Sequence, residues 1–80
     1  MYVVYILRSQ SMPNKHYVGF TTDLKKRLTA HNAKKSSYSR KYAPWEIHTY
    51  LVFTSENKAR DFERYLKKGS GWAFLKKRLI

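Results

Sequence analysis

The chain has 80 residues, of which 42% are hydrophobic, and it contains no cysteine, which excludes a disulfide framework and a thiolate zinc site. Seventeen Lys and Arg residues against five Asp and Glu give a formal net charge of +12, which favours a polyanionic partner over an uncharged one. The length predicts a single domain over residues 1–80, and no apolar run approaches the roughly 20 residues that span a bilayer.

The cations are spread through every segment instead of lining one amphipathic helix, which favours nucleic acid over a membrane surface. A basic surface that serves only solubility is the alternative. The opening apolar run lacks the basic leader and cleavage site of a signal peptide, so we expect a cytoplasmic location.

The first predicted element is a strand over residues 2–8, which are rich in Val, Tyr, Ile and Leu. Both parities of this run are apolar, so we expect both faces to be covered and the strand to be central in its sheet. Residues 10–14 have turn chemistry, and residues 15–21 form a second strand, which completes a β-hairpin.

Thr21 or Thr22 is then expected to cap a helix that starts at Asp23 and runs to about residue 33. Residues 34–45 are polar and basic, with Tyr38, Tyr42 and Trp45 interleaved, and we predict a long functional loop there.

The third strand is expected over residues 46–53, with three apolar side chains of the same parity: Ile47, Leu51 and Phe53. Ser55 is expected to cap a second helix that Gly69 ends, and Ser70 to cap a third. The apolar side chains of the third helix repeat at i, i+3 and i+7: Trp72, Leu75 and Leu79. The order of elements is β-β-α-β-α-α, an α+β fold.

Five side chains along this order could cleave a phosphodiester bond: Tyr5, Tyr17, Arg27, His31 and Glu63. They supply two phenols, a guanidinium, an imidazole and one carboxylate. A free phenol is only about 0.1% ionised at neutral pH, so it needs help from cations or a metal. By sequence, the cations available to the phenols are Lys15, His16 and Lys25. The alternative is that the two tyrosines are ordinary strand aromatics.

Arg27 and His31 are one helical turn apart and therefore share a face. Arg27 can grip a phosphate oxygen, and His31 can orient the attacking water or move a proton. A solvated arginine and a structural histidine are the alternatives. Gly19, which has no side chain, allows another backbone or a substrate phosphate to approach, unless it simply marks a strand end.

Glu63 borders the apolar stripe of its predicted helix, so its carboxylate has reason to be paired or metal-bound. A single carboxylate suits Mg²⁺, which keeps several waters and takes other oxygens from phosphate. An ion pair with Lys67, four residues later, is the alternative.

The stretch over residues 34–42 mixes cations, hydroxyls and rings, and such a mixture can hold phosphates and stack on bases. A flexible, merely soluble loop is the alternative. The nucleic-acid-binding residues that we expect are Gly19, Lys15, Lys25, Lys34, Lys35, Tyr38, Arg40 and Lys41.

Together, these residues resemble the motifs of the GIY-YIG endonuclease superfamily. Val3-Val4-Tyr5 stands at the first motif and Tyr17-Val18-Gly19 at the second, and Arg27, His31 and Glu63 follow in the family's order. The chain looks most like the small stand-alone bacterial members, which resemble the N-terminal nuclease domain of the C component of excinuclease ABC. The resemblance implies a small three-stranded antiparallel sheet flanked by helices.

It also implies roles for the residues. Tyr5 would help to take a proton from the attacking water, Tyr17 would position the phosphate, and Glu63 would hold a divalent metal, Mg²⁺ or Mn²⁺, with no small-molecule cofactor. Two departures are visible: Val3 replaces a glycine, and no asparagine follows Asn57.

We therefore expect a metal-dependent endonuclease acting on DNA, in repair or in processing of structured DNA. The alternative is a nucleic-acid-binding module of the same fold, for DNA or RNA, with weak or no cleavage. A third interpretation is a small basic protein that serves an assembly by contact alone. The sequence predicts no particular oligomeric state.

Overall fold

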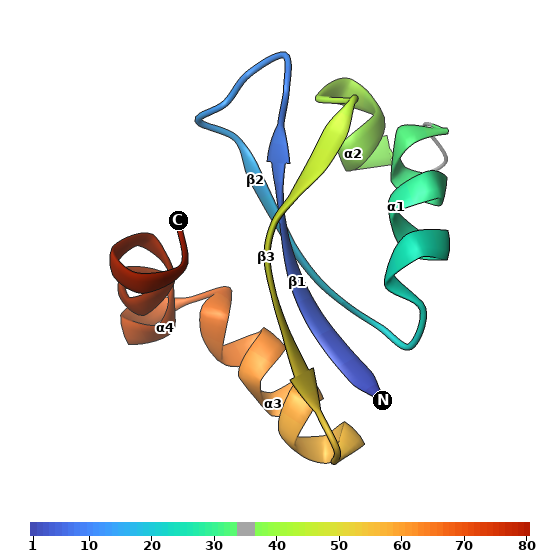
Figure 1. Cartoon of the computed structure of the whole chain (residues 1–80). Helices are drawn as coiled ribbons and strands as arrows, with labels where there is room; N and C mark the ends of the chain where they lie inside the picture. Colours follow the sequence, from blue (N-terminus) through green and yellow to red (C-terminus); the bar gives the residue numbers. More distant parts are fainter. Residues whose placement is uncertain (34–36) are drawn as a thin grey trace.

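A computed structural model describes residues 1–33 and 37–80, and it contains one three-stranded antiparallel sheet (Figure 1). The strands are β1 (Tyr2–Ser9), β2 (His16–Thr21) and β3 (Trp45–Phe53), arranged in the order β2-β1-β3. The expected central position of the first strand is confirmed, and so is the β-hairpin that joins β1 to β2.

Helices lie on both sides of the sheet (Figure 1). They are α1 (Leu24–Asn32), α2 (Ser37–Lys41), α3 (Glu56–Leu66) and α4 (Gly69–Phe74), followed by a π-helical turn, η1 (Leu75–Leu79). The predicted loop over residues 34–45 was therefore wrong in part, because it contains α2. No helix in the described part of the chain combines the length and the apolar character needed to cross a membrane.

Strand β1 separates two apolar clusters because successive side chains of a strand point to opposite faces. The cluster on the α3 side is made of Val4, Ile6, Val18, Ala59, Leu66 and Leu75. The cluster on the α1 side is made of Val3, Tyr5, Leu7 and Trp45, with Leu24 and Leu28 of α1 packed against it. The second cluster thus contains one of the two predicted catalytic phenols.

A bulge in β3 changes which of its side chains face each cluster. Ile6 pairs with Thr49, but Leu7 pairs with Ile47, so His48 is an extra residue between the two pairs. One extra residue reverses the parity of the strand. Ile47 therefore faces the α1 side while Leu51 packs on the α3 side, and the prediction that they share a face was wrong.

The start of α1 differs from the predicted cap. The side chain of Asp23 caps the helix by accepting a hydrogen bond from the backbone N–H of Lys26 at 3.0 Å. Thr21 instead accepts from the Asp23 N–H with its hydroxyl, at 3.1 Å. A carboxylate suits this position because its negative charge also opposes the positive end of the helix dipole. Ser55 caps α3 as predicted.

The chain breaks between α3 and α4 near Gly69, as predicted, but Ser70 does not cap α4. Gly69 has a φ of 58°, which an L side chain rarely adopts, and the N-cap of α4 is Lys68, without a side-chain hydrogen bond, so Ser70 is not the cap. Gly71 faces α3 so closely that a Cβ atom there would overlap the carbonyl group of Tyr65. The next residue, Trp72, consequently points away from the core and is 44% exposed, contrary to the predicted stripe.

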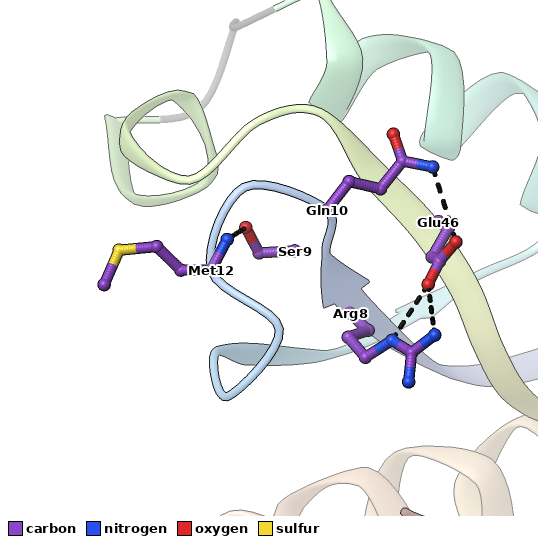
Figure 2. Close-up of polar contacts among 5 residues, drawn as sticks. All are labelled: Arg8, Ser9, Gln10, Met12 and Glu46. Carbon is purple, nitrogen blue, oxygen red and sulfur yellow. Dashed lines mark hydrogen bonds and ion pairs between the residues drawn. The ribbon is translucent and has the colours of Figure 1, made fainter.

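Side-chain contacts fix the turn that joins β1 to β2 (Figure 2). Arg8 donates to one carboxylate oxygen of Glu46 from Nε at 2.8 Å and from Nη2 at 2.6 Å, which lowers the pKa of Glu46. The buried Ser9 hydroxyl accepts from the Met12 N–H at 3.0 Å and donates to the Tyr42 carbonyl at 2.7 Å. These bonds hold the turn against the segment that follows α2.

Candidate active site

The hydroxyl group of Tyr5 lies at the centre of a polar cluster between β1 and α1. The Tyr5 Oη atom is 3.0 Å from His31 Nε2, and Arg27 Nε donates a hydrogen bond to Oη at 3.3 Å. Tyr5 and His31 are both buried, with 1% and 2% of their surfaces exposed. The one-turn spacing on α1 thus brings Arg27 and His31 to the same phenol.

Tyr17 joins this cluster from β2. Its ring centroid is 4.6 Å from that of His31 and 6.2 Å from that of Tyr5. The Arg27 guanidinium also interacts with both phenols, and these interactions raise its pKa, the Tyr5 hydrogen bond most of all. Four of the five predicted catalytic side chains are therefore gathered around Tyr5 Oη.

Gly19 lies opposite Tyr5 in the pairing of β1 with β2. A Cβ atom at position 19 would overlap the hydroxyl oxygen and the ring of Tyr5. The group that approaches Gly19 is thus the Tyr5 phenol and not another backbone, while the approach of a substrate phosphate stays a prediction. The glycine makes room for the hydroxyl to reach its partners on α1.

Gly19→Ala is therefore expected to destabilise the fold by about 1–3 kcal/mol, because the buried Tyr5 ring must shift. Urea unfolding followed by circular dichroism measures this change. Gly69→Ala is the matched control: its Cβ would meet no atom, and it carries only the backbone strain of a φ of 58°. Tyrosine near-ultraviolet signals should change in Gly19→Ala only, and unaltered stability and signals in that variant would contradict the contact.

The electrostatics of the cluster keep the phenol protonated and the imidazole neutral. Burial raises the pKa of Tyr5 above its ordinary value of 10.0, although the Arg27 hydrogen bond opposes the rise. Burial and the charge of Arg27 lower the pKa of His31 below 6.5. Among the cations, Arg27 does lower the pKa of Tyr5 as expected, but desolvation outweighs it, and the contribution expected from a bound metal stays a prediction.

The cations proposed for that purpose lie elsewhere. Lys15 Nζ is 5.6 Å from the centre of the Tyr42 ring, Lys25 is exposed on α1, and the His16 ring contacts His48 at 5.8 Å. Arg27 alone among the cations bonds the Tyr5 hydroxyl within the described residues.

Glu63 lies on α3, the helix that packs on the opposite face of the sheet from Tyr5. Its side chain is 16% exposed and forms an ion pair of 2.5 Å with Lys67, the contact that the sequence offered as the alternative. Its negative charge nevertheless acts on Tyr5, whose pKa it raises. Glu63 thus lies within electrostatic reach of the phenol while its carboxylate is held by one lysine.

The remaining carboxylates are engaged away from the cluster. Glu46 pairs with Arg8, Glu56 with Arg60 and Asp61 with Arg64, and Asp23 caps α1. Over residues 1–33 and 37–80, no group of three or more His, Asp or Glu side chains could hold a metal. A single half-buried carboxylate fits Mg²⁺, which takes its other ligands from water and phosphate. Glu63 is the residue that would hold such an ion.

The predicted nucleic-acid-binding residues occupy several places. Lys41 Nζ, like that of Lys15, is 5.6 Å from the centre of the Tyr42 ring, and Arg40 is exposed on α2. Tyr38 is 46% exposed, with its ring 5.9 Å from that of Tyr17. Lys34 and Lys35 lie outside the described residues.

The residues that fix α1 and α2 against β3 were not apparent from the sequence. Asn32 Oδ1 accepts from the Trp45 N–H at 2.6 Å, and Asn32 Nδ2 donates to the Trp45 carbonyl at 3.1 Å. The Trp45 indole donates to the Ser39 carbonyl at 2.7 Å. A tryptophan at a strand start was a visible signal, but its pairing with Asn32 depends on tertiary structure.

Comparisons with known proteins agree with this arrangement. A family model described as the GIY-YIG catalytic domain matches residues 1–74. UPF0213 proteins of Streptococcus pyogenes serotype M5 (strain Manfredo) and serotype M1 are each 47% identical to this chain over 53 residues. That match covers 65% of this chain and 58% of each relative, so the chain spans less than two thirds of their length.

Proposed function

The chain belongs to the GIY-YIG catalytic-domain family, and from this premise we propose that it is a metal-dependent endonuclease that hydrolyses phosphodiester bonds in DNA. The family is one of nucleases, and its members generally use a divalent metal. The observation that supports the proposal most is the position of Tyr5 Oη between Arg27 Nε and His31 Nε2.

In the proposed mechanism, Tyr5 and His31 act together to remove a proton from the attacking water. The neutral imidazole takes the phenolic proton at Nε2, which leaves a phenolate, and this phenolate oxygen is the base that afterwards takes a proton from the water. Until the water proton arrives, Arg27 Nε–H and His31 Nε2–H both donate to the phenolate oxygen, which favours its charged form. His31 is buried, so it acts through Tyr5 and does not orient the water itself.

Arg27 has a second task in this proposal. Its Nε donates to Tyr5 and the guanidinium also interacts with Tyr17, and the N–H donors left over would bind non-bridging oxygens of the scissile phosphate. Tyr17, half-buried beside His31, offers its hydroxyl to the same phosphate. These contacts oppose the charge that develops in the transition state.

Glu63 would hold the metal ion. When bound, a divalent ion supplies a Lewis acid that polarises the phosphate and stabilises the leaving oxygen. Lys67 would then have to release Glu63, and the freed ammonium group could contact the DNA backbone. We propose Mg²⁺ as the ion, with Mn²⁺ as its substitute.

The alternative function is a binding module that holds nucleic acid without cutting it. The net charge of +12 favours binding in either case, with steep salt dependence. The polar cluster around Tyr5 is what favours a nuclease over a binding module.

A cleavage assay with purified protein tests the proposal. We expect nicking of supercoiled plasmid, and cutting of branched or gapped oligonucleotides, with Mg²⁺ or Mn²⁺ but not in the presence of EDTA. If the protein processes structured DNA in repair, we expect it to cut branched substrates faster than plain duplex. Failure to cut any of these substrates with either metal, with binding retained, would favour the binding module.

A further inference from the structure

A hollow of about 260 Å³ lies along the free edge of β2, next to the polar cluster. It is lined by His16, Tyr17, Val18, Tyr38, Lys67 and Trp72. The lining includes residues of β2, α2 and α4, so the fold brings elements from both sides of the sheet to one place. Its volume is below the roughly 300–1,000 Å³ of pockets that enclose whole small-molecule ligands, and it suits a single planar ring system.

Two exposed aromatic side chains flank this hollow. Tyr38 of α2 is 46% exposed and Trp72 of α4 is 44% exposed. Exposed large aromatic side chains are typical of binding sites, and a planar ligand can stack on them. Lys76 Nζ, 5.9 Å from the centre of the Trp72 ring, adds a positive charge beside the hollow.

The hollow shares two residues with the surroundings of the candidate active site. Tyr17 lines it and also contacts His31, with ring centroids 4.6 Å apart. Lys67 lines it and also holds Glu63 at 2.5 Å. A group bound in the hollow is therefore adjacent to Tyr17 of the candidate active site and to Lys67, the ion-pair partner of Glu63.

We propose that this hollow is a subsite for one unpaired nucleobase, belonging to a nucleotide next to the scissile phosphate. The inference rests on the proposed function for the identity of that phosphate, and on the rings and cations of the hollow for the base. A nucleobase has a planar face that can stack on the aromatic rings, and it is attached to an anionic phosphate backbone, which the net charge of +12 attracts. A base inside a duplex cannot enter, so the substrate presents an unstacked nucleotide at this position.

The subsite is tested by combining a substitution in the protein with the removal of a single base from the DNA, and by measuring whether the two effects on binding add. Binding of a fluorescent single-stranded DNA of about 15 nucleotides is measured in EDTA, so that no cleavage is required, with an abasic residue placed at each position in turn. We expect one abasic position to weaken binding to the wild-type protein about tenfold. In Trp72→Ala, binding is expected to be weaker by about the same factor, and the abasic residue at that position to cause no further loss.

Tyr50→Ala is the matched control, because Tyr50 is an aromatic residue with 55% exposure on β3, at the other edge of the sheet. It should retain the wild-type response to the abasic residue, as should Trp72→Phe, which keeps a ring. Thermal unfolding verifies that each variant folds, and Tyr38→Ala serves as a second probe of the hollow.

The outcomes separate this inference from the proposed function. Equal sensitivity of wild type, Trp72→Ala and Tyr38→Ala to abasic residues overturns the subsite, whether or not the protein cuts DNA. Loss of that sensitivity in both variants supports the subsite even if no metal yields cleavage, in which case only the proposed nuclease activity fails.

Discussion

Tyr5→Phe is expected to lower the single-turnover rate of DNA cleavage by about 10²–10⁴-fold, the usual contribution of a positioned acid–base group. The phenylalanine keeps the ring that packs beside Gly19 but loses the bonds to Arg27 and His31. Since DNA binding depends mainly on exposed cations, its affinity should change little. Cleavage of a labelled oligonucleotide with enzyme in excess gives the rate directly.

Tyr2→Phe is the matched control for this experiment. It removes the same atom from the same strand, but Tyr2 packs on the α3 side, where its ring stacks on Phe20 at 6.3 Å. We expect this variant to cleave at the wild-type rate. Cleavage by Tyr5→Phe at the wild-type rate would remove Tyr5 from the mechanism, and His31 with it, because His31 reaches the water only through Tyr5.

Glu63→Gln is expected to lower metal-dependent cleavage by about 10³-fold, since a bound metal contributes several kcal/mol to transition-state stabilisation. The variant removes the charge that would hold the ion and keeps the shape of the side chain. It also frees Lys67, which is 48% exposed and can remain solvated, so the fold should persist. Binding of Mn²⁺, followed by electron paramagnetic resonance, should weaken in parallel.

Asp61→Asn controls for the general loss of one negative charge from α3. Asp61 is exposed and pairs with Arg64, and the change removes the same charge two residues from Glu63. We expect this variant to keep both cleavage and Mn²⁺ binding. If Glu63→Gln retained full metal-dependent activity, the metal would have to be held by other groups, and the proposed role of Glu63 would be wrong.

The strands and their order were predictable because local pattern and tertiary structure agree. Two-sided apolar character identified β1 as the central strand, and turn residues separated it from β2. Ser55 marked the start of α3 by chemistry that needs no distant partner, a hydroxyl for the first N–H groups. Gly69 marked the break between α3 and α4, where the backbone adopts a positive φ, although α3 itself ends at Leu66.

Errors arose where a distant contact decides the structure. The bulge at His48 reverses the parity of β3, and period alone cannot show that Ile47 and Leu51 face opposite sides. Trp72 has the right spacing for a core residue, but the close approach of Gly71 to Tyr65 turns it outward. Helix α2 is a single short element that the polar sequence before Pro44 did not indicate.

The proximity of four of the five predicted site residues was predictable, and their chemistry only partly. The one-turn spacing on a helix was enough to place Arg27 and His31 together. The pairing of two strands was enough to place Tyr17 near Tyr5. The direction of the Tyr5 pKa shift was not predictable, because it is set mainly by burial, which depends on the whole fold. The approach of Tyr5 to Gly19 likewise becomes visible only once β1 and β2 are in register.

Because β1 separates the two apolar clusters, residues of the α3 cluster can be substituted without moving the polar groups around Tyr5. The α3 cluster contains only hydrocarbon and aromatic side chains, whereas the α1 cluster includes the polar atoms around Tyr5. Volume-conserving replacements such as Leu66→Met can therefore adjust the lifetime of the folded state while the reactive groups stay in place. Sequence drift should be tolerated beneath α3 and resisted beneath α1, and β1, whose buried side chains alternate between the two clusters, has little freedom on either side.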